Sequence, residues 1–112
     1  MNERFISPCK PPEGLERELL TILAEECAEV AQRCTKALRF GLEEVQPGQE
    51  YTNAERIEVE LGDILAAFNI LEEMGVMNWD NVTLHAENKR FKLQRYLQST
   101  QTTNSSPKGD SL

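Results

Sequence analysis

Apolar residues recur at intervals of three and four along most of the chain, which is the spacing of one face of an α-helix. Three stretches follow this pattern, over about residues 13–40, 53–74 and 78–98. No stretch alternates apolar and polar residues as a half-buried strand would. The pattern therefore predicts three helices and an all-α fold.

Residues that commonly cap helices stand at the ends of these stretches. Gly41 follows the first stretch, and glycine is a natural C-terminal cap. Thr52 or Asn53 can cap the N-terminus of the second helix, because their side chains accept a hydrogen bond from a free backbone N–H. Asn78 or Asp80 can begin the third helix in the same way.

The second predicted helix is apolar over about 200° or more of its circumference, and such a helix is normally buried on two sides. We expect the first two helices to pack antiparallel, which covers only one of those sides. A second copy of the chain would supply the other. The expected architecture is an antiparallel four-helix bundle completed by self-association, as a homodimer or a homotetramer.

The segments outside the helices differ from them in composition. Residues 1–12 contain three prolines and are expected to form an extended arm. Residues 99–112 are dominated by Ser, Thr, Asn, Pro and Gly, a composition that predicts a disordered tail. One helical domain over residues 13–98 remains, with a polar loop over residues 41–52.

Charge and cysteine content exclude several classes of function. The formal net charge of −7 argues against binding to nucleic acid or to an anionic membrane, because both depend on excess Lys and Arg. No apolar run approaches the ~20 residues of a membrane span, and the N-terminus lacks a signal-peptide pattern. The three cysteines, Cys9, Cys27 and Cys34, form no Cys-x-x-Cys motif, and we expect buried reduced thiols. A cytoplasmic protein is expected.

Four carboxylates interrupt the apolar faces of the first two helices. Glu26 falls in the middle of the apolar arc of the first helix and Glu29 on its edge, one turn away. Glu60 lies within the apolar arc of the second helix, and Asp63 follows one turn later. The arc of the first helix is set by Leu15, Leu19, Ile22, Leu23, Val30 and Cys34. Ionised carboxylates taken out of water need a compensating positive group.

A magnesium ion would provide that compensation. Mg²⁺ prefers carboxylate, water and phosphate oxygens, and it usually sits between a few carboxylates and the phosphates of a nucleotide. Mn²⁺ accepts similar ligands. A di-iron bundle would need Glu-x-x-His on two helices, and the single histidine, His85, is in neither acidic motif. Taken singly, each acid is also explained by an ordinary solvated helix surface.

Cations follow the acids along the first helix. Arg33 is one turn beyond Glu29, and Lys36 lies on its flank, where both could meet the phosphates of a metal-bound nucleotide. The alternative is that Glu29 and Arg33 form an ordinary i,i+4 ion pair.

The third helix carries the only basic cluster in this acidic chain, from residue 88 to 96. Asn88, Lys89 and Lys92 are its candidate phosphate ligands. A solvated polar face is the alternative for this cluster too.

The pattern Glu25-Glu26-x-x-Glu29 followed by Glu60-x-x-Asp63 resembles the MazG-like superfamily of all-α nucleoside triphosphate pyrophosphohydrolases. That superfamily includes dimeric dUTPases and phosphoribosyl-ATP pyrophosphatases. The resemblance covers about residues 15–98 and implies that Glu26, Glu29, Glu60 and Asp63 bind Mg²⁺. The long loop between the two motifs departs from the family pattern, and the basic segment matches it only loosely.

These observations predict a Mg²⁺-dependent hydrolase that cleaves a (deoxy)nucleoside triphosphate between its α and β phosphates, releasing monophosphate and pyrophosphate. Glu26 and Glu29 are the first candidates for the base that activates water. One alternative is a phosphoribosyl-ATP pyrophosphatase or a dUTP/dCTP-specific enzyme. Another is a non-catalytic helical oligomer that binds nucleotides.

Overall fold

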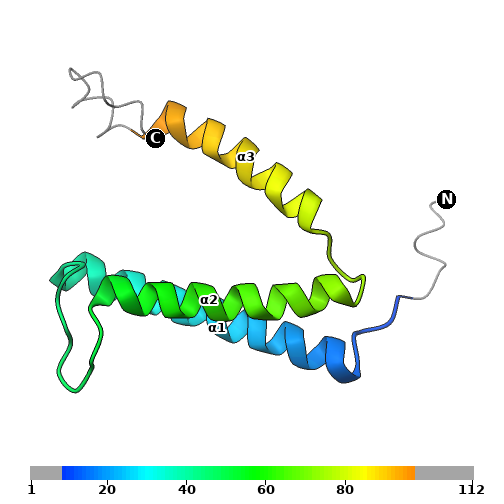
Figure 1. Cartoon of the computed structure of the whole chain (residues 1–112), viewed down its shortest axis with the longest axis horizontal. Helices are drawn as coiled ribbons and strands as arrows, with labels where there is room; N and C mark the ends of the chain where they lie inside the picture. Colours follow the sequence, from blue (N-terminus) through cyan, green and yellow to red (C-terminus); the bar gives the residue numbers. More distant parts are fainter. Residues whose placement is uncertain (1–8, 98–112) are drawn as a thin grey trace. The chain divides into compact units, whose positions relative to one another are not determined.

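The computed structural model describes residues 9–97, which form three α-helices: α1 (Gly14–Phe40), α2 (Asn53–Glu73) and α3 (Trp79–Tyr96) (Figure 1). Within these residues there is no β-strand, and the only β-type pairing is an isolated bridge between Val45 and Thr52. The prediction of an all-α fold is confirmed. Residues 9–12 of the expected arm are not helical, whereas residues 1–8 and the expected tail over residues 99–112 lie outside the described part of the chain.

The C-terminus of α1 ends as its sequence predicts. Gly41 has a φ of 105°, a backbone conformation that residues with a side chain rarely adopt, and its N–H donates to the carbonyl oxygen of Ala37 at 2.8 Å. Arg39 lies in the last turn, where its charge interacts favourably with the negative end of the helix dipole. The chain therefore leaves α1 at a position fixed by local chemistry.

The N-terminus of α2 is capped by Thr52. Its hydroxyl accepts from the N–H of Glu55 at 3.1 Å, and the Glu55 carboxylate accepts from the N–H of Thr52 at 2.9 Å, which is a capping box. Asn53 is only 1% exposed, and its side chain binds groups that precede α2. Its Nδ2 donates to the carbonyl oxygen of Gly41 at 2.9 Å and to Glu44 Oε1 at 3.1 Å. These bonds tie the start of α2 to the end of α1.

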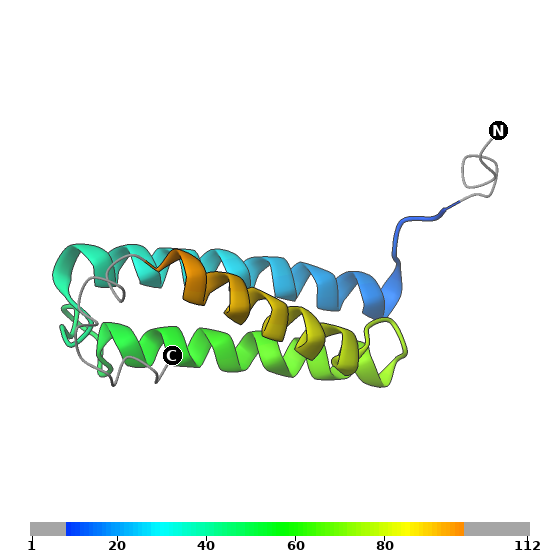
Figure 2. The same cartoon turned by 90° about the horizontal axis from the view of Figure 1, so that it is seen from above.

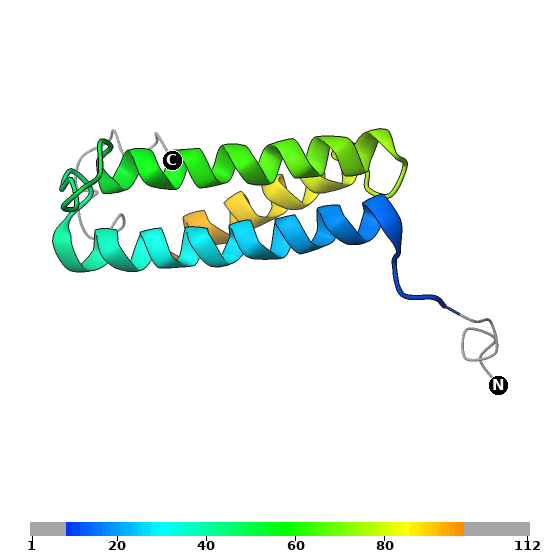
Figure 3. The ribbon, with the colours of Figure 1, turned by 90° about the horizontal axis from the view of Figure 1, so that it is seen from below.

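The helices α1 and α2 pack side by side and antiparallel (Figures 2 and 3). Their shared core lies toward the N-terminal half of α1 and the C-terminal half of α2. It consists of Leu19, Ala67 and Leu71, with Leu20, Leu23 and Met77 partly buried against it. Burial of this apolar surface stabilises the hairpin and sets the register in which the two helices face each other.

The helix α3 belongs to a second compact unit, which begins at Asn78. The side chain of Asn78 accepts from the N–H of Asn81 at 2.9 Å and so caps the helix, as one of the two sequence alternatives predicted. None of the residues of α3 is buried. None of the three helices is apolar enough over a sufficient length to cross a membrane.

Much of the apolar surface of the hairpin stays exposed. On α2, Ala67, Phe68 and Leu71 are buried, whereas one further set is exposed: Val59, Leu61, Leu65, Ile70 and Met74. One side of the wide apolar face is thus covered and another is not. Self-association, which would cover the exposed side, stays a prediction.

The prediction of buried cysteines was wrong. Cys9 and Cys27 are exposed, Cys34 is half-buried, and all three are free thiols. For Cys27 and Cys34 the physical reason is the width of the apolar arc of α1, which is larger than the strip that one neighbouring helix can cover. Cys9 precedes α1 and lies in the non-helical segment.

Candidate metal centre

The acids of the two helices lie on the faces that pack together. Glu26 follows the core residue Leu19 by seven positions, and Glu60 precedes the core residue Ala67 by seven. Seven residues are close to two full turns, so each acid projects from nearly the same side of its helix as its core residue. Because the helices run antiparallel, Glu26 and Glu60 reach the same level of the hairpin.

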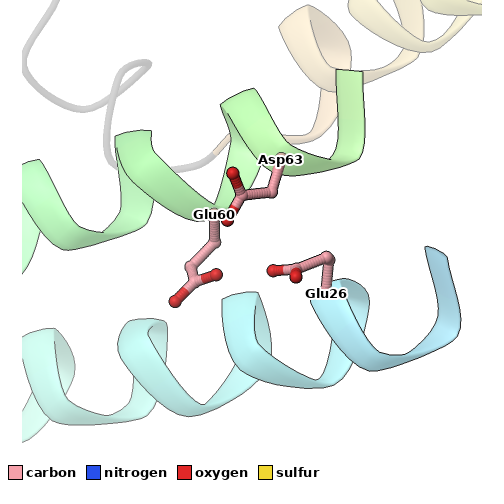
Figure 4. A group of neighbouring side chains, drawn as sticks. All are labelled: Glu26, Glu60 and Asp63. Carbon is pink, nitrogen blue, oxygen red and sulfur yellow. The ribbon is translucent and has the colours of Figure 1, made fainter. Parts of the chain in front are cut away.

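Three carboxyl groups gather at this level. One oxygen each from Glu26, Glu60 and Asp63 lies within 4.8 Å of the others. Glu60 and Asp63 project from α2 toward Glu26 on α1 (Figure 4). Glu26 and Glu60 are half-buried and Asp63 is exposed, so the group opens to solvent on the Asp63 side.

The environment of Glu26 disfavours its ionised form. The pKa of this carboxyl is raised from its ordinary 4.5 to about 7, mainly by a side-chain hydrogen bond with Glu60, which requires a proton on one of the two carboxyls. Burial and the charges of Asp63, Glu60 and Glu29 raise the pKa further. The Oε1 atom of Glu26 is buried and accepts no hydrogen bond. Glu26, Glu60 and Asp63 thus form a set of hard oxygen donors of the kind that binds a divalent cation.

Glu29, the fourth predicted acid, is not part of this group of three. Its Oε1 lies 3.0 Å from Nη2 of Arg33, one turn further along α1. The same guanidinium reaches across to α2, where its Nε lies 3.5 Å from Oε2 of Glu60. Arg33 thus contacts one acid on each helix.

The remaining predicted ligands lie further along α1 and on α3. Lys36 is half-buried on α1, one turn beyond Arg33. Asn88, Lys89 and Lys92 are exposed on α3, in the second unit of the chain. Contacts of all four with phosphate stay predictions.

Sequence reasoning missed two features of this region. The first is the ion pair between Arg33 and Glu60, which was signalled by the seven-residue interval between Glu26 and Arg33, since that interval puts Arg33 on the same face. The second is the inward position of Asn53, whose Oδ1 is buried without a hydrogen-bond donor. A residue next to a capping threonine gives no local signal of burial.

Comparison with protein-family models, with curated proteins and with solved structures finds no match to this chain.

Proposed function

We propose that the protein is a Mg²⁺-dependent nucleotide pyrophosphohydrolase, which cleaves a (deoxy)nucleoside triphosphate between its α and β phosphates. The observation that carries the proposal is the meeting of Glu26, Glu60 and Asp63, with ligand oxygens within 4.8 Å, at the level where two helices pack. The nearby guanidinium of Arg33 supports it, because a metal-bound phosphate needs cationic contacts as well as the metal.

The donor set fits a hard divalent cation. Carboxylate oxygens, one of them buried and without a hydrogen-bond donor, suit Mg²⁺ or Mn²⁺ better than a soft metal. The cation would be held by Glu26, Glu60 and Asp63, with Glu29 as a further ligand. When bound, it would neutralise phosphate oxygens and lower the pKa of a water ligand.

The chain's own residues would bind the substrate and move the proton. Glu26 and Glu29 are our candidates for the base, and the one of them that is not fully engaged with the metal would accept the proton of the attacking water. Arg33 and Lys36 would hold phosphate oxygens from α1. Asn88, Lys89 and Lys92 on α3 are our further candidates for phosphate ligands.

The proposed active form is a homodimer or homotetramer. Its support is the exposed apolar side of α2, where Leu61 is 50% exposed and Ile70 41%. Surfaces of this kind on a small domain are normally covered by another chain. The net charge of −7 disfavours nucleic acid and anionic membranes as partners. We place the activity in the cytoplasm.

The second candidate is a nucleotide-binding helical oligomer without turnover. One observation favours it. Glu29 forms an ion pair with Arg33, which leaves three acids to bind the metal and no further carboxylate to act as the base. The products of a reaction separate the two candidates, because a binding module releases none.

The decisive experiment incubates the purified protein with Mg²⁺ and a panel of nucleotides that includes dUTP, dCTP and phosphoribosyl-ATP. We expect equimolar monophosphate and pyrophosphate from at least one of them. In Glu60→Gln the yield should fall at least about a hundredfold, since the negative charge that holds the metal is lost. Glu58→Gln, a matched change at an exposed position of α2, should keep full activity.

Release of inorganic phosphate in place of pyrophosphate would contradict the proposed cleavage site. Full activity in Glu60→Gln would contradict the metal assignment. Metal-dependent nucleotide binding without any product would establish the second candidate.

A further inference from the structure

Arg33 lies beside the three clustered acids and contacts one acid on each helix. Its guanidinium lies 3.0 Å from Glu29 on its own helix and 3.5 Å from Glu60 on α2. Its side chain is only 18% exposed, and its buried Nε makes no hydrogen bond of good geometry. The cation is therefore held inside the helix pair by charge attraction to two acids.

A divalent cation bound by Glu26, Glu60 and Asp63 would compete with this guanidinium. Both are positive and both draw on the carboxylate of Glu60, so each weakens the binding of the other. Glu29 is the acid whose contact with Arg33 can change when the cation binds. Its side chain is 42% exposed, and an i,i+4 ion pair with one partner open to solvent is a modest interaction that a divalent cation can replace.

Glu29 also stands one turn from Glu26, so its carboxylate can swing from Arg33 toward the side on which the acids cluster. That movement would give the metal a further negative ligand. It would also leave the guanidinium of Arg33 with one acid fewer and with free N–H donors beside the metal.

We propose that Arg33 is an internal competitor of the metal, which holds Glu29 away from the site until a divalent cation takes that carboxylate over. The guanidinium released by the exchange then binds the phosphates that arrive with the cation. The inference rests on the proposed function for the identity of the cation and its phosphate ligand. Its alternative is a static ion pair that only ties α1 to α2.

The test measures Mn²⁺ affinity by calorimetry without nucleotide, in the wild type, Arg33→Gln, Glu29→Gln and the double variant. Arg33→Gln should bind Mn²⁺ at least about fivefold more tightly, because it removes a competing cation and frees Glu29. Glu29→Gln should bind it at least about threefold more weakly. In the Glu29→Gln background, Arg33→Gln should tighten Mn²⁺ binding by less than it does in the wild type, since only the competition for Glu60 remains.

Two exposed positions of α1 supply matched controls. Arg39→Gln and Glu18→Gln make the same changes in charge away from the cluster, and each should alter Mn²⁺ affinity by less than about twofold. Circular dichroism establishes that each variant is folded. If Arg33→Gln does not fold, Arg33→Lys replaces it. Lysine keeps the charge but lacks the fork that holds two acids at once, so it should also tighten Mn²⁺ binding.

The second readout uses a non-hydrolysable nucleoside triphosphate at saturating Mn²⁺. Here the effect of Arg33→Gln should reverse, with nucleotide affinity at least about fivefold weaker, because a charge-assisted hydrogen bond to phosphate is lost. A static ion pair predicts no such reversal of sign.

Weaker Mn²⁺ binding in Arg33→Gln would overturn the inference and leave the metal site intact. The same gain in the wild-type and Glu29→Gln backgrounds would also overturn it, because Arg33 would then act only as a remote charge. Coupling between the two positions in a protein that hydrolyses no nucleotide would uphold the inference and overturn the proposed function. Absence of Mn²⁺ binding in every variant would overturn both.

Discussion

Three carboxyl groups lie close together where α1 packs against α2, and this proximity changes the protonation of Glu26. Its pKa is raised to about 7, so near neutral pH a proton is bound where a cation would otherwise reside. Proton and metal therefore exclude each other at this residue. Two consequences of this competition can be measured.

The first prediction concerns stability against pH in the absence of metal. Because the pKa of Glu26 is higher in the folded protein than its ordinary 4.5, the folded state binds the proton more tightly than the unfolded state. The stabilisation is complete below pH 4.5 and should be lost as the pH rises toward and through about 7. Urea unfolding between pH 4 and pH 8 should show this fall in the free energy of unfolding for the wild type. In Glu26→Gln the fall should be absent. Equal pH profiles for the two proteins would contradict it.

The second prediction concerns metal binding and stability. At a hundredfold excess of Mg²⁺ over its Kd, the free energy of unfolding should rise by about 2.7 kcal/mol, because the ion binds only the folded state. Asp63→Asn should lose most of this gain, whereas Glu58→Gln should keep it. The gain should also shrink as the pH falls below about 7, where the proton occupies Glu26. A melting temperature indifferent to Mg²⁺, with and without nucleotide, would indicate a purely structural helix pair.

At the scale of the elements, the connection between α1 and α2 depends on Asn53. Its side chain donates to the carbonyl oxygen of Gly41 and to the carboxylate of Glu44, and its N–H donates to the carbonyl oxygen of Glu44 at 2.9 Å. Glu44 also accepts a hydrogen bond from the side chain of Gln46. This network fixes where α2 begins relative to the end of α1, and so it sets the level of Glu60 along the hairpin.

We therefore expect Asn53→Ala to lower the free energy of unfolding by about 1–3 kcal/mol, because it removes two hydrogen bonds from a buried side chain, one of them to a carboxylate. It should also weaken metal binding if the register of α2 shifts. Asn69→Ala, at an exposed asparagine of the same helix, should change stability by less than about 0.5 kcal/mol. Chemical unfolding of both variants measures the difference. Equal stabilities would show that the network does not hold the connection.

The basic cluster of α3 gives the fourth prediction. If Lys89 or Lys92 contacts substrate phosphate, its replacement by Ala should raise KM or lower kcat by about tenfold or more, since loss of a charge-assisted hydrogen bond costs about 1.5–3 kcal/mol. Metal affinity should not change, which separates these lysines from the acids. Wild-type kinetics in both variants would leave phosphate recognition to the metal, Arg33 and Lys36.

For the whole molecule, the exposed apolar side of the hairpin favours self-association. Two helices bury only Leu19, Ala67, Phe68 and Leu71 among their apolar residues. So small a core stabilises a domain only marginally. Among the apolar residues of α2, Phe68 is buried and Ile70 is 41% exposed, so Ile70 is the position at which to test a subunit contact.

Ile70→Glu should convert the proposed oligomer to monomer, because burying an unpaired carboxylate at a subunit contact costs several kcal/mol. Asn69→Glu adds the same charge at an exposed polar position and should leave the oligomer intact. Sedimentation velocity at micromolar concentration, with circular dichroism on the same samples, measures assembly and folding separately. A well-folded monomer in the wild type would refute self-association.

The sequence by itself determined the features that depend on local periodicity and capping. The apolar spacing predicted three helices whose observed ends lie within about two residues of expectation, since a helix end depends on the capping residue beside it, such as Gly41 after α1 and Thr52 before α2. Periodicity also placed Glu26 and Glu60 on the inner faces, because a side chain's direction around a helix follows from its position in the sequence.

Only the tertiary structure decided which partner each charged group meets. The packing of α1 against α2 brings Glu26 to Glu60 and Asp63, and it brings Arg33 to Glu60. The ion pair of Glu29 with Arg33 lies within α1 and is the i,i+4 alternative that the sequence already offered. The contacts between α1 and α2 depend on the register of two helices that are distant in the sequence, and a register is set by side-chain volumes and by the connection at Asn53. Residue spacing within one helix contains no information about that register, which is why four acids were predicted together and three are found together.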